Sequence, residues 1–320
     1  MVTMAEARAP RRPHEGEDIR RARRGRRSRA SAREAAAGWG FVGPALVIVL
    51  GLTIFPGIWA LVLSFRTWDG FSPPESVGLQ NYADLMSDDV LRAAVLHTLL
   101  YTALFVPASV VLGLFLATAL NRRIRFVSLY RTAVFAPFVA SAVATGILTT
   151  YLFSPQFGLV NNVLRLLHVP PQGWLESRSE ALVVIVIMSL WGQAAFTTVI
   201  YLAALQDVPL EVIEAATVDG ASRWQRFRHV VWPHLLPVTA FVAVYQTIEA
   251  LQLFDLVFVT TRGGPLDATQ TIVFYIWKVA FHKLQFGYGS AIAYGLFLVT
   301  LVVTILVTLA QRRAARKDLR

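Results

Sequence analysis

Apolar residues dominate six long runs of the chain, and polar connections separate these runs. A membrane-spanning helix needs about 20 mainly apolar residues, and each run reaches that length. Prolines inside the runs do not exclude helices, because neighbouring helices in a membrane satisfy the carbonyl groups that proline frees. The first run is too long for the apolar region of a signal peptide, and no small-residue cleavage site follows it. The pattern predicts six membrane-spanning helices, at residues 41–65, 93–120, 128–153, 181–205, 237–260 and 287–310.

The positions of lysine and arginine predict which parts of the chain face the cytoplasm. Of the 30 basic residues, 23 lie in the two termini and in the connections after the second and fourth runs. Basic residues concentrate on the cytoplasmic side of membrane proteins, so both termini and these connections are expected there. The predicted fold class is therefore an all-α integral membrane protein. Its six-helix transmembrane domain covers 39–310, between basic cytoplasmic tails at 1–38 and 311–320.

The composition agrees with a membrane protein. Hydrophobic residues make up 55% of the chain and charged residues only 16%, and the mean hydropathy is +0.53. A soluble domain has about 25% charged residues, so a water-soluble enzyme, a free DNA-binding protein and a disordered chain are excluded. The chain has no cysteine, which excludes disulfides and cysteine-based metal sites. Its six histidines are scattered, so no metal site is expected.

The net charge of +10 belongs to the predicted cytoplasmic segments. The tail 1–38 is expected to enforce orientation and to contact the anionic lipid of the bilayer. Nucleic-acid binding is the alternative for such a basic arm, but no aromatic interleaving or folded module supports it. No nucleic-acid partner is therefore expected.

Two of the connections contain helical patterns of their own. Apolar residues at 159–167 have the spacing of an amphipathic helix lying on the outer surface. The apolar stretch 272–281 is about 10 residues long and too short to span, so an interfacial or re-entrant helix is expected. No phosphate-cradling Gly-x-x-x-x-Gly-Lys-Ser/Thr run occurs in the sequence. We expect no cofactor on this chain, and any ATP hydrolysis must come from another chain.

The cytoplasmic connection 206–236 has the pattern of two short helices joined at a glycine. Pro209 suits the first position of a helix, and Gly220 permits a left-handed or sharply bent backbone. The second helix carries Trp224 three residues before Phe227, and Pro233 is expected to end it before the fifth span. This helix–Gly–helix element could dock into a groove of a cytoplasmic partner. It could equally rest on lipid headgroups, because amphipathic helices do both.

The same segment resembles a known sequence motif. Glu214-Ala215-Ala216, followed by Gly220, Val230 and Pro233, looks like the EAA loop of permease subunits in ATP-binding-cassette importers. In the family pattern, Glu-Ala-Ala is followed by three residues, Gly, nine residues and then Ile-x-Leu-Pro. Here Val230 stands in the Ile position, and Trp232 replaces the usual Leu. Further segments resemble carbohydrate-uptake permeases of the maltose and glycerol-phosphate type, in the expected order: 78–82, 161–162 with 174–175, 261–265 and 286–291.

The resemblance implies a set of partners and a role for the loop. It implies a heterodimer with a second permease chain, a pair of ATPase subunits beneath it that hold ATP and Mg²⁺, and an extracellular binding protein that delivers a carbohydrate-like solute. The location would be a bacterial cytoplasmic membrane. Six residues would couple the chain to the ATPase: Glu214, Ala215, Ala216, Asp219, Gly220 and Pro233.

Polar side chains inside the fourth and fifth spans are candidates for a solute path. Ionisable residues at membrane depth are costly and usually mark a pathway or a buried pair. In the fourth span, Ser189 and Thr197 flank Gln193 at a spacing of four residues, which forms a polar stripe. Sugars need many hydrogen-bonding partners and an aromatic face, although interhelical hydrogen bonds would explain the same residues. The candidate path residues are Gln193, Tyr245, Gln246, Glu249, Gln252 and Asp255.

Two other functions compete with an ATP-driven importer. An ion-gradient-driven secondary carrier usually shows inverted repeats and helices broken at mid-membrane, and neither is evident in the sequence. An intramembrane enzyme needs clustered catalytic groups at membrane depth, where only Glu249 and Asp255 are ionisable. We therefore expect a non-catalytic transport subunit that works by alternating access.

Overall fold

The computed structural model describes residues 37–122 and 125–317. The predicted tail 1–38 lies almost wholly outside the described residues, and of the tail 311–320 the described part continues the last helix. The chain divides into two compact units, with the boundary between Ala60 and Leu61. The described residues contain five helices long and apolar enough to cross a bilayer, and a sixth span if one bent helix pair counts as a single span. The predicted multi-span helical fold is therefore confirmed in outline.

The described part of the first unit, residues 37–60, belongs to one apolar helix, Ala37–Leu63. It contains a π-helical turn, η1 (Leu50–Ile54), followed directly by α2 (Phe55–Leu63). The N–H of Phe55 donates to the carbonyl of Leu50, five residues back. Pro56 comes next and has no N–H to donate. The wider π turn lets the helix continue past this proline without a break.

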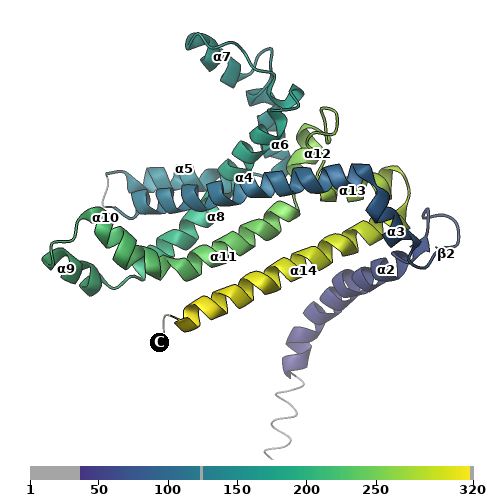
Figure 1. The fold of residues 1–320 in the computed structure, drawn as a ribbon, viewed down its shortest axis with the longest axis horizontal. Coiled ribbons are helices and arrows are strands. Elements are labelled where there is room, and N and C mark those ends of the chain that lie inside the picture. Colours follow the sequence, from purple (N-terminus) through teal and green to yellow (C-terminus); the bar gives the residue numbers. More distant parts are fainter. Residues whose placement is uncertain (1–36, 123–124, 318–320) are drawn as a thin grey trace, which may run out of the picture. The chain divides into compact units, whose positions relative to one another are not determined.

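The second unit contains a two-stranded antiparallel ribbon and a bundle of helices (Figure 1). In chain order, its elements are β1 (Arg66–Thr67), β2 (Glu75–Ser76), α3 (Gln80–Ser87), α4 (Asp89–Leu120), α5 (Val127–Val139), α6 (Ala142–Leu152), α7 (Leu159–Leu166), η2 (Trp174–Glu176), α8 (Ala181–Gln206), α9 (Leu210–Val218), α10 (Arg223–Arg226), η3 (Phe227–Val231), α11 (Trp232–Leu251), α12 (Asp255–Thr260), α13 (Ile272–Trp277), η4 (Lys278–His282) and α14 (Phe286–Lys317).

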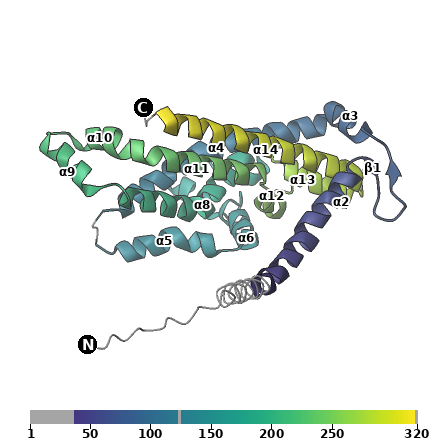
Figure 2. The same cartoon turned by 90° about the horizontal axis from the view of Figure 1, so that it is seen from below.

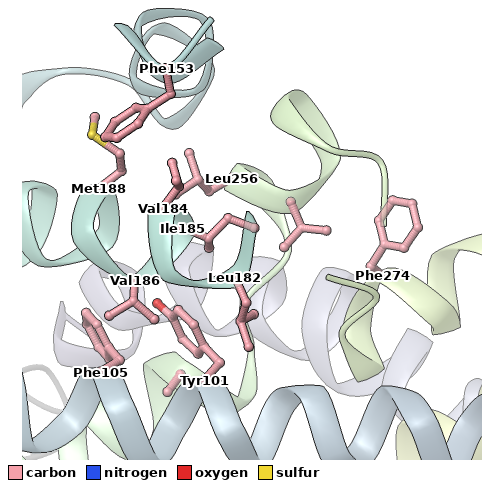
Figure 3. Packing of buried hydrophobic residues seen from close by; sticks show 12 residues of the cluster. Tyr101, Phe105, Phe153, Leu182, Val184, Ile185, Val186, Met188, Leu256 and Phe274 are labelled. Carbon is pink, nitrogen blue, oxygen red and sulfur yellow. The ribbon is translucent and has the colours of Figure 1, made fainter. Parts of the chain in front are cut away.

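Long helices that are distant in sequence form the body of this unit. α4 packs against α8 and α11, and α11 in turn packs against α14. The end of α4, the start of α5, the α9–α10 pair and the end of α14 lie at one end of the unit (Figures 1 and 2). The distribution of lysine and arginine predicts that these same segments face the cytoplasm. In the core, Tyr101 and Phe105 of α4 face Leu182 and Val186 of α8 (Figure 3).

The third predicted span is not one straight helix, which corrects the interpretation from hydropathy. α5 and α6 meet at an angle of 104°. Ala140 is extended at the break, with ψ 140°, and the Ser141 hydroxyl caps α6 by accepting the N–H of Ala144 at 3.2 Å. All residues around the break are apolar or small, so hydropathy alone cannot reveal it. The serine cap supplies the backbone N–H with a partner where the helix is interrupted.

The fifth predicted span differs from the structure at both ends. Pro233 does not end a separate helix, because α10, η3 and α11 form one continuous helix through it. The π turn η3, in which the Trp232 N–H donates to the Phe227 carbonyl, precedes Pro233 just as η1 precedes Pro56. At the other end the helix is interrupted at residues 252–254. There the Thr271 hydroxyl donates to the freed carbonyl of Leu253 at 2.7 Å.

Asp88 fixes the start of α4 to two other helices. One carboxylate oxygen accepts the N–H groups of Val90 and Leu91, each at 2.9 Å. The other accepts the hydroxyls of Tyr275 and Tyr288, each at 2.7 Å. Partial burial opposes ionisation, but the hydrogen bonds from the two tyrosines and the two amides outweigh it and hold the pKa of Asp88 below its ordinary value. The second span therefore begins four residues earlier than predicted, at a cap that also anchors α13 and α14.

Candidate functional site

A cavity of about 280 Å³ lies where both helix breaks meet. Pro137, Phe138 and Ala140 reach it from the α5–α6 break, and residues 252–256 reach it from the α11–α12 break. Residues of α4, α6, α8 and α11 complete the lining. Irregular backbone within a membrane bundle is tolerated only where protein or a water-filled cavity surrounds it. The two helix breaks therefore both border this cavity, which we call the central cavity.

Four of the six predicted path residues line the central cavity. Gln193 reaches it from α8, Glu249 from α11, Gln252 from the break and Asp255 from the first turn of α12. Glu249, Gln252 and Asp255 are exposed. The side chains therefore offer two carboxylates and two amides to anything that enters the cavity. Such a set can accept and donate hydrogen bonds to hydroxyl groups.

The other two predicted path residues do not line the cavity. Gln246 is fully buried and donates to the Ser109 hydroxyl on α4 at 2.9 Å, so it forms an interhelical hydrogen bond. Tyr245 stacks on Phe196, with ring centroids 4.3 Å apart. Tyr245 precedes Glu249 by about one helical turn but is not among the residues that line the cavity.

The structure adds cavity residues that reasoning from the sequence missed. Tyr101 and Phe105 of α4 line the cavity and stack on each other, with ring centroids 5.3 Å apart and planes 9° from parallel. Ser189, which the sequence placed in the polar stripe of α8, also reaches the cavity. Thr197 of the same stripe does not, because it packs against Gly113 of α4. A spacing of four residues from Tyr101 to Phe105 places both rings on one helix face, but that spacing does not show which face lines a cavity.

Beyond the α6–α12 pair lies a second cavity of about 820 Å³. Tyr151, Phe157 and Glu176 are among its lining residues. α6 and α12 pack closely between the two cavities, since a Cβ atom added to Gly146 would lie 2.5 Å from the Cγ1 of Val259. Only glycine at position 146 permits this approach. The contact lies between residues of the two linings, since Thr145 and Asp255 line the central cavity and Ile147 and Thr260 line the second cavity.

The predicted helix–Gly–helix element is present as α9, a bend and α10. Gly220 has φ 79°, in the left-handed region that glycine adopts without strain. The Ala221 N–H donates back to the carbonyl of Ala216 at 3.0 Å, which closes the end of α9. The Arg226 guanidinium donates to the Thr217 hydroxyl at 2.9 Å, and this bond holds α10 against α9. Ser222 and Gln225 form a capping box that starts α10. The segment from α9 through α10, residues 210–226, therefore has a defined structure, and we call it the elbow.

The elbow exposes both charged and apolar side chains. Val218 is 87% exposed, Trp224 66% and Leu210 65%. Of the residues in the motif, Glu214, Ala215, Asp219, Gly220 and Pro233 are exposed and Ala216 is half-buried. A contiguous exposed patch with large apolar residues marks an interaction surface. Among the described residues, no group of three or more histidine and acidic side chains is placed to hold a metal ion.

Comparison with known proteins identifies the family. Residues 109–317 match the family of the binding-protein-dependent transport system inner membrane component. The chain belongs to this family. The permease is 36% identical over 281 residues to the lactose transport system permease of Rhizobium radiobacter, covering 86% of this chain and 94% of that protein. It is 32% identical over 274 residues to the trehalose/maltose transport system permease of Thermococcus litoralis, covering 85% and 92%.

The fold of the permease also has a solved counterpart. A chain of a bacterial ABC transporter involved in the import of the acidic polysaccharide alginate superposes with a TM-score of 0.79. That match covers 90% of this chain and 99% of the other, at 22% sequence identity. It supports the fold of the permease.

Membership of this family decides between the three functions considered from the sequence. The permease is a multi-pass inner-membrane transport component of a binding-protein-dependent ABC system, and it is not a catalytic subunit. One argument against a secondary carrier was wrong, because the permease does have helices broken within the bundle. Broken helices occur wherever a transport protein builds a site from backbone and helix ends, so they do not distinguish a secondary carrier from an ATP-driven importer. Membership of the family does distinguish them.

Proposed function

We propose that the permease moves a saccharide through the central cavity by alternating access. The observation that carries the proposal is the cavity itself, which joins two helix breaks and offers the exposed ring of Phe138 beside four hydrogen-bonding side chains. Saccharides bind to sites that combine a flat aromatic surface with several polar partners. Relatives that transport lactose or trehalose and maltose support the carbohydrate class. Gln193, Glu249, Gln252 and Asp255 would contact the solute.

The energy for transport would enter at the elbow. We propose that an ATPase pair carrying ATP and Mg²⁺ docks on the exposed face of α9, through Glu214, Ala215, Ala216, Asp219 and Gly220, and that Pro233 shapes the helix behind it. The exposed apolar residues of the elbow support a docking surface. This role places the elbow on the cytoplasmic side, as the distribution of basic residues predicts.

Two further partners complete the proposed assembly. A second, different permease chain would pair with this one in a bacterial cytoplasmic membrane, and an extracellular binding protein would deliver the saccharide on the opposite side. A family defined by dependence on a binding protein supports the latter partner. Delivery of the saccharide from outside would require that α6 and α12 separate, so that the two cavities connect. The inward-facing and outward-facing states would then differ in which cavity is accessible.

Substitution at Gly220 tests the coupling role. Proline fixes φ near −65°, whereas Gly220 has φ 79°, so Gly220→Pro must break the elbow. Gly220→Asn is the matched control, because asparagine tolerates the left-handed region. We expect Gly220→Pro and Glu214→Arg to abolish ATP-driven uptake of radiolabelled trehalose and lactose into proteoliposomes that contain the whole transporter. The proline variant should still insert but lose the ATPase on affinity purification. Normal uptake by Gly220→Pro would disprove the coupling role.

A further inference from the structure

The charges that line the central cavity are all of one sign. Its two ionisable residues, Glu249 and Asp255, are both acidic and both exposed. Neither lysine nor arginine occurs among the described residues that line it. The basic residues nearest to the lining in sequence are Arg131 on α5, six residues before Pro137, and Arg262, six residues after Leu256. The cavity therefore presents negative charge with no basic group of its own to balance it.

The two carboxylates lie on opposite sides of the α11–α12 break. Glu249 lies in the last turn of α11. Asp255 is the first residue of α12, where the helix dipole favours a negative charge. Neither carboxylate forms an ion pair with a described lysine or arginine. Their negative charge therefore remains available to a solute in the cavity.

Fold alone does not set the charge of the transported saccharide. The solved structure with the same fold belongs to an importer of an acidic polysaccharide. Charge selection must therefore come from the side chains that line the path. An anion that enters the central cavity of this permease gives up water and meets two like charges in a partly enclosed site. Both effects disfavour it.

We propose that the central cavity admits neutral and cationic saccharides and rejects those with a carboxylate or phosphate group. This inference rests on the proposed transport function and adds the charge class of its substrate. Hydroxyl groups of a neutral sugar bind the carboxylates and amides as donors and acceptors. The ammonium group of an amino sugar is attracted to Glu249 and Asp255. A uronate or sugar phosphate is repelled by both.

Three isosteric probes test the proposal directly. They are methyl α-D-glucopyranoside, the 2-amino-2-deoxy analogue and methyl α-D-glucuronopyranoside, which are neutral, cationic and anionic. Binding to the purified whole transporter in detergent is measured by saturation-transfer NMR, which detects millimolar affinities. We expect the neutral and cationic probes to bind, and the glucuronide to bind at least tenfold more weakly than the neutral glucoside.

Variants assign the discrimination to the two carboxylates. In the Glu249→Gln, Asp255→Asn double variant, the ratio of glucoside to glucuronide affinity should fall to threefold or less. Each single variant should reduce the ratio by at least threefold, which keeps the test available if the double variant does not fold. Glu176→Gln, which removes an acid from the second cavity, is the matched control and should keep the tenfold ratio.

The outcomes separate the two proposals. Equal affinity of the wild type for glucoside and glucuronide, or a ratio unchanged in every cavity variant, overturns the charge selection and leaves sugar transport intact. No saturation transfer to the neutral glucoside, trehalose or lactose overturns the transport of saccharides through this cavity, and the charge selection with it.

Discussion

Asp88→Ala should destabilise the permease more than any change at an exposed acid nearby. The variant removes the cap of α4 and the shared acceptor of Tyr275 and Tyr288. Loss of a helix cap costs about 1 kcal/mol. Loss of two hydrogen bonds to a charged group costs about 1.5 kcal/mol each at a half-buried site. We therefore expect the free energy of unfolding to fall by about 4 kcal/mol.

Two variants control for unrelated effects. Asp88→Asn keeps a good capping residue but removes the charge, so a loss of about 2 kcal/mol is expected. Asp89→Ala removes the next carboxylate, whose side chain is 88% exposed in its pair with Arg92. Exposed ion pairs contribute about 0.5 kcal/mol. Thermal unfolding of the purified chain in detergent, followed by tryptophan fluorescence, should rank the variants in the order Asp89→Ala, Asp88→Asn and Asp88→Ala.

Acid should remove the advantage of the aspartate. A carboxyl whose pKa is lowered by folding contributes stability above its ordinary pKa and loses it as the pH falls through the folded value. Because the pKa of Asp88 is lowered, the difference between wild type and Asp88→Asn should be full at neutral pH and shrink below about pH 4. Equal destabilisation by Asp88→Ala and Asp89→Ala would refute the reasoning.

Three further predictions concern buried residues of the described chain. Asn161→Ala leaves the Trp174 indole N–H without its acceptor, so denaturant titration should show a loss of about 2 kcal/mol. Gln246→Leu should change the KM for trehalose uptake less than twofold, because this buried glutamine binds another helix and not the cavity. Gly146→Ala should cost about 1–3 kcal/mol in the same titration, because its new methyl group would overlap Val259; unchanged stability would contradict the close packing.

Hydropathy predicted the spans well because it depends on length and composition alone. Five helices and the bent pair fall within or around the six predicted ranges. The break at Ala140 was missed because extended alanine and serine have no distinctive hydropathy. Pro233 was misinterpreted for a different reason. A proline usually ends a helix, and the π turn that accommodates it here leaves no pattern in the sequence.

The candidate site was partly predictable for a related reason. The sequence reveals that a residue in an apolar span is polar, but not the direction in which its side chain points. Glu249, Gln252 and Asp255 were therefore predicted together with the buried Gln246. All of these residues fall in one predicted span, but only packing separates a residue that faces α4 from one that faces a cavity. Tyr101 was missed for the converse reason, because an aromatic residue in an apolar span looks like ordinary core.

The unbroken helix through Pro233 has a mechanical consequence. One continuous helix, from Arg223 to Leu251, connects the elbow to the cavity. It is about 43 Å long at 1.5 Å per residue. A tilt of about 5° imposed at the elbow swings its far end by about 4 Å. Glu249 lies at that end, so a displacement of α10 by a partner would move the cavity wall directly. No series of side-chain rearrangements between α10 and the cavity is needed. The stiffness of the helix determines how much of the displacement reaches the cavity.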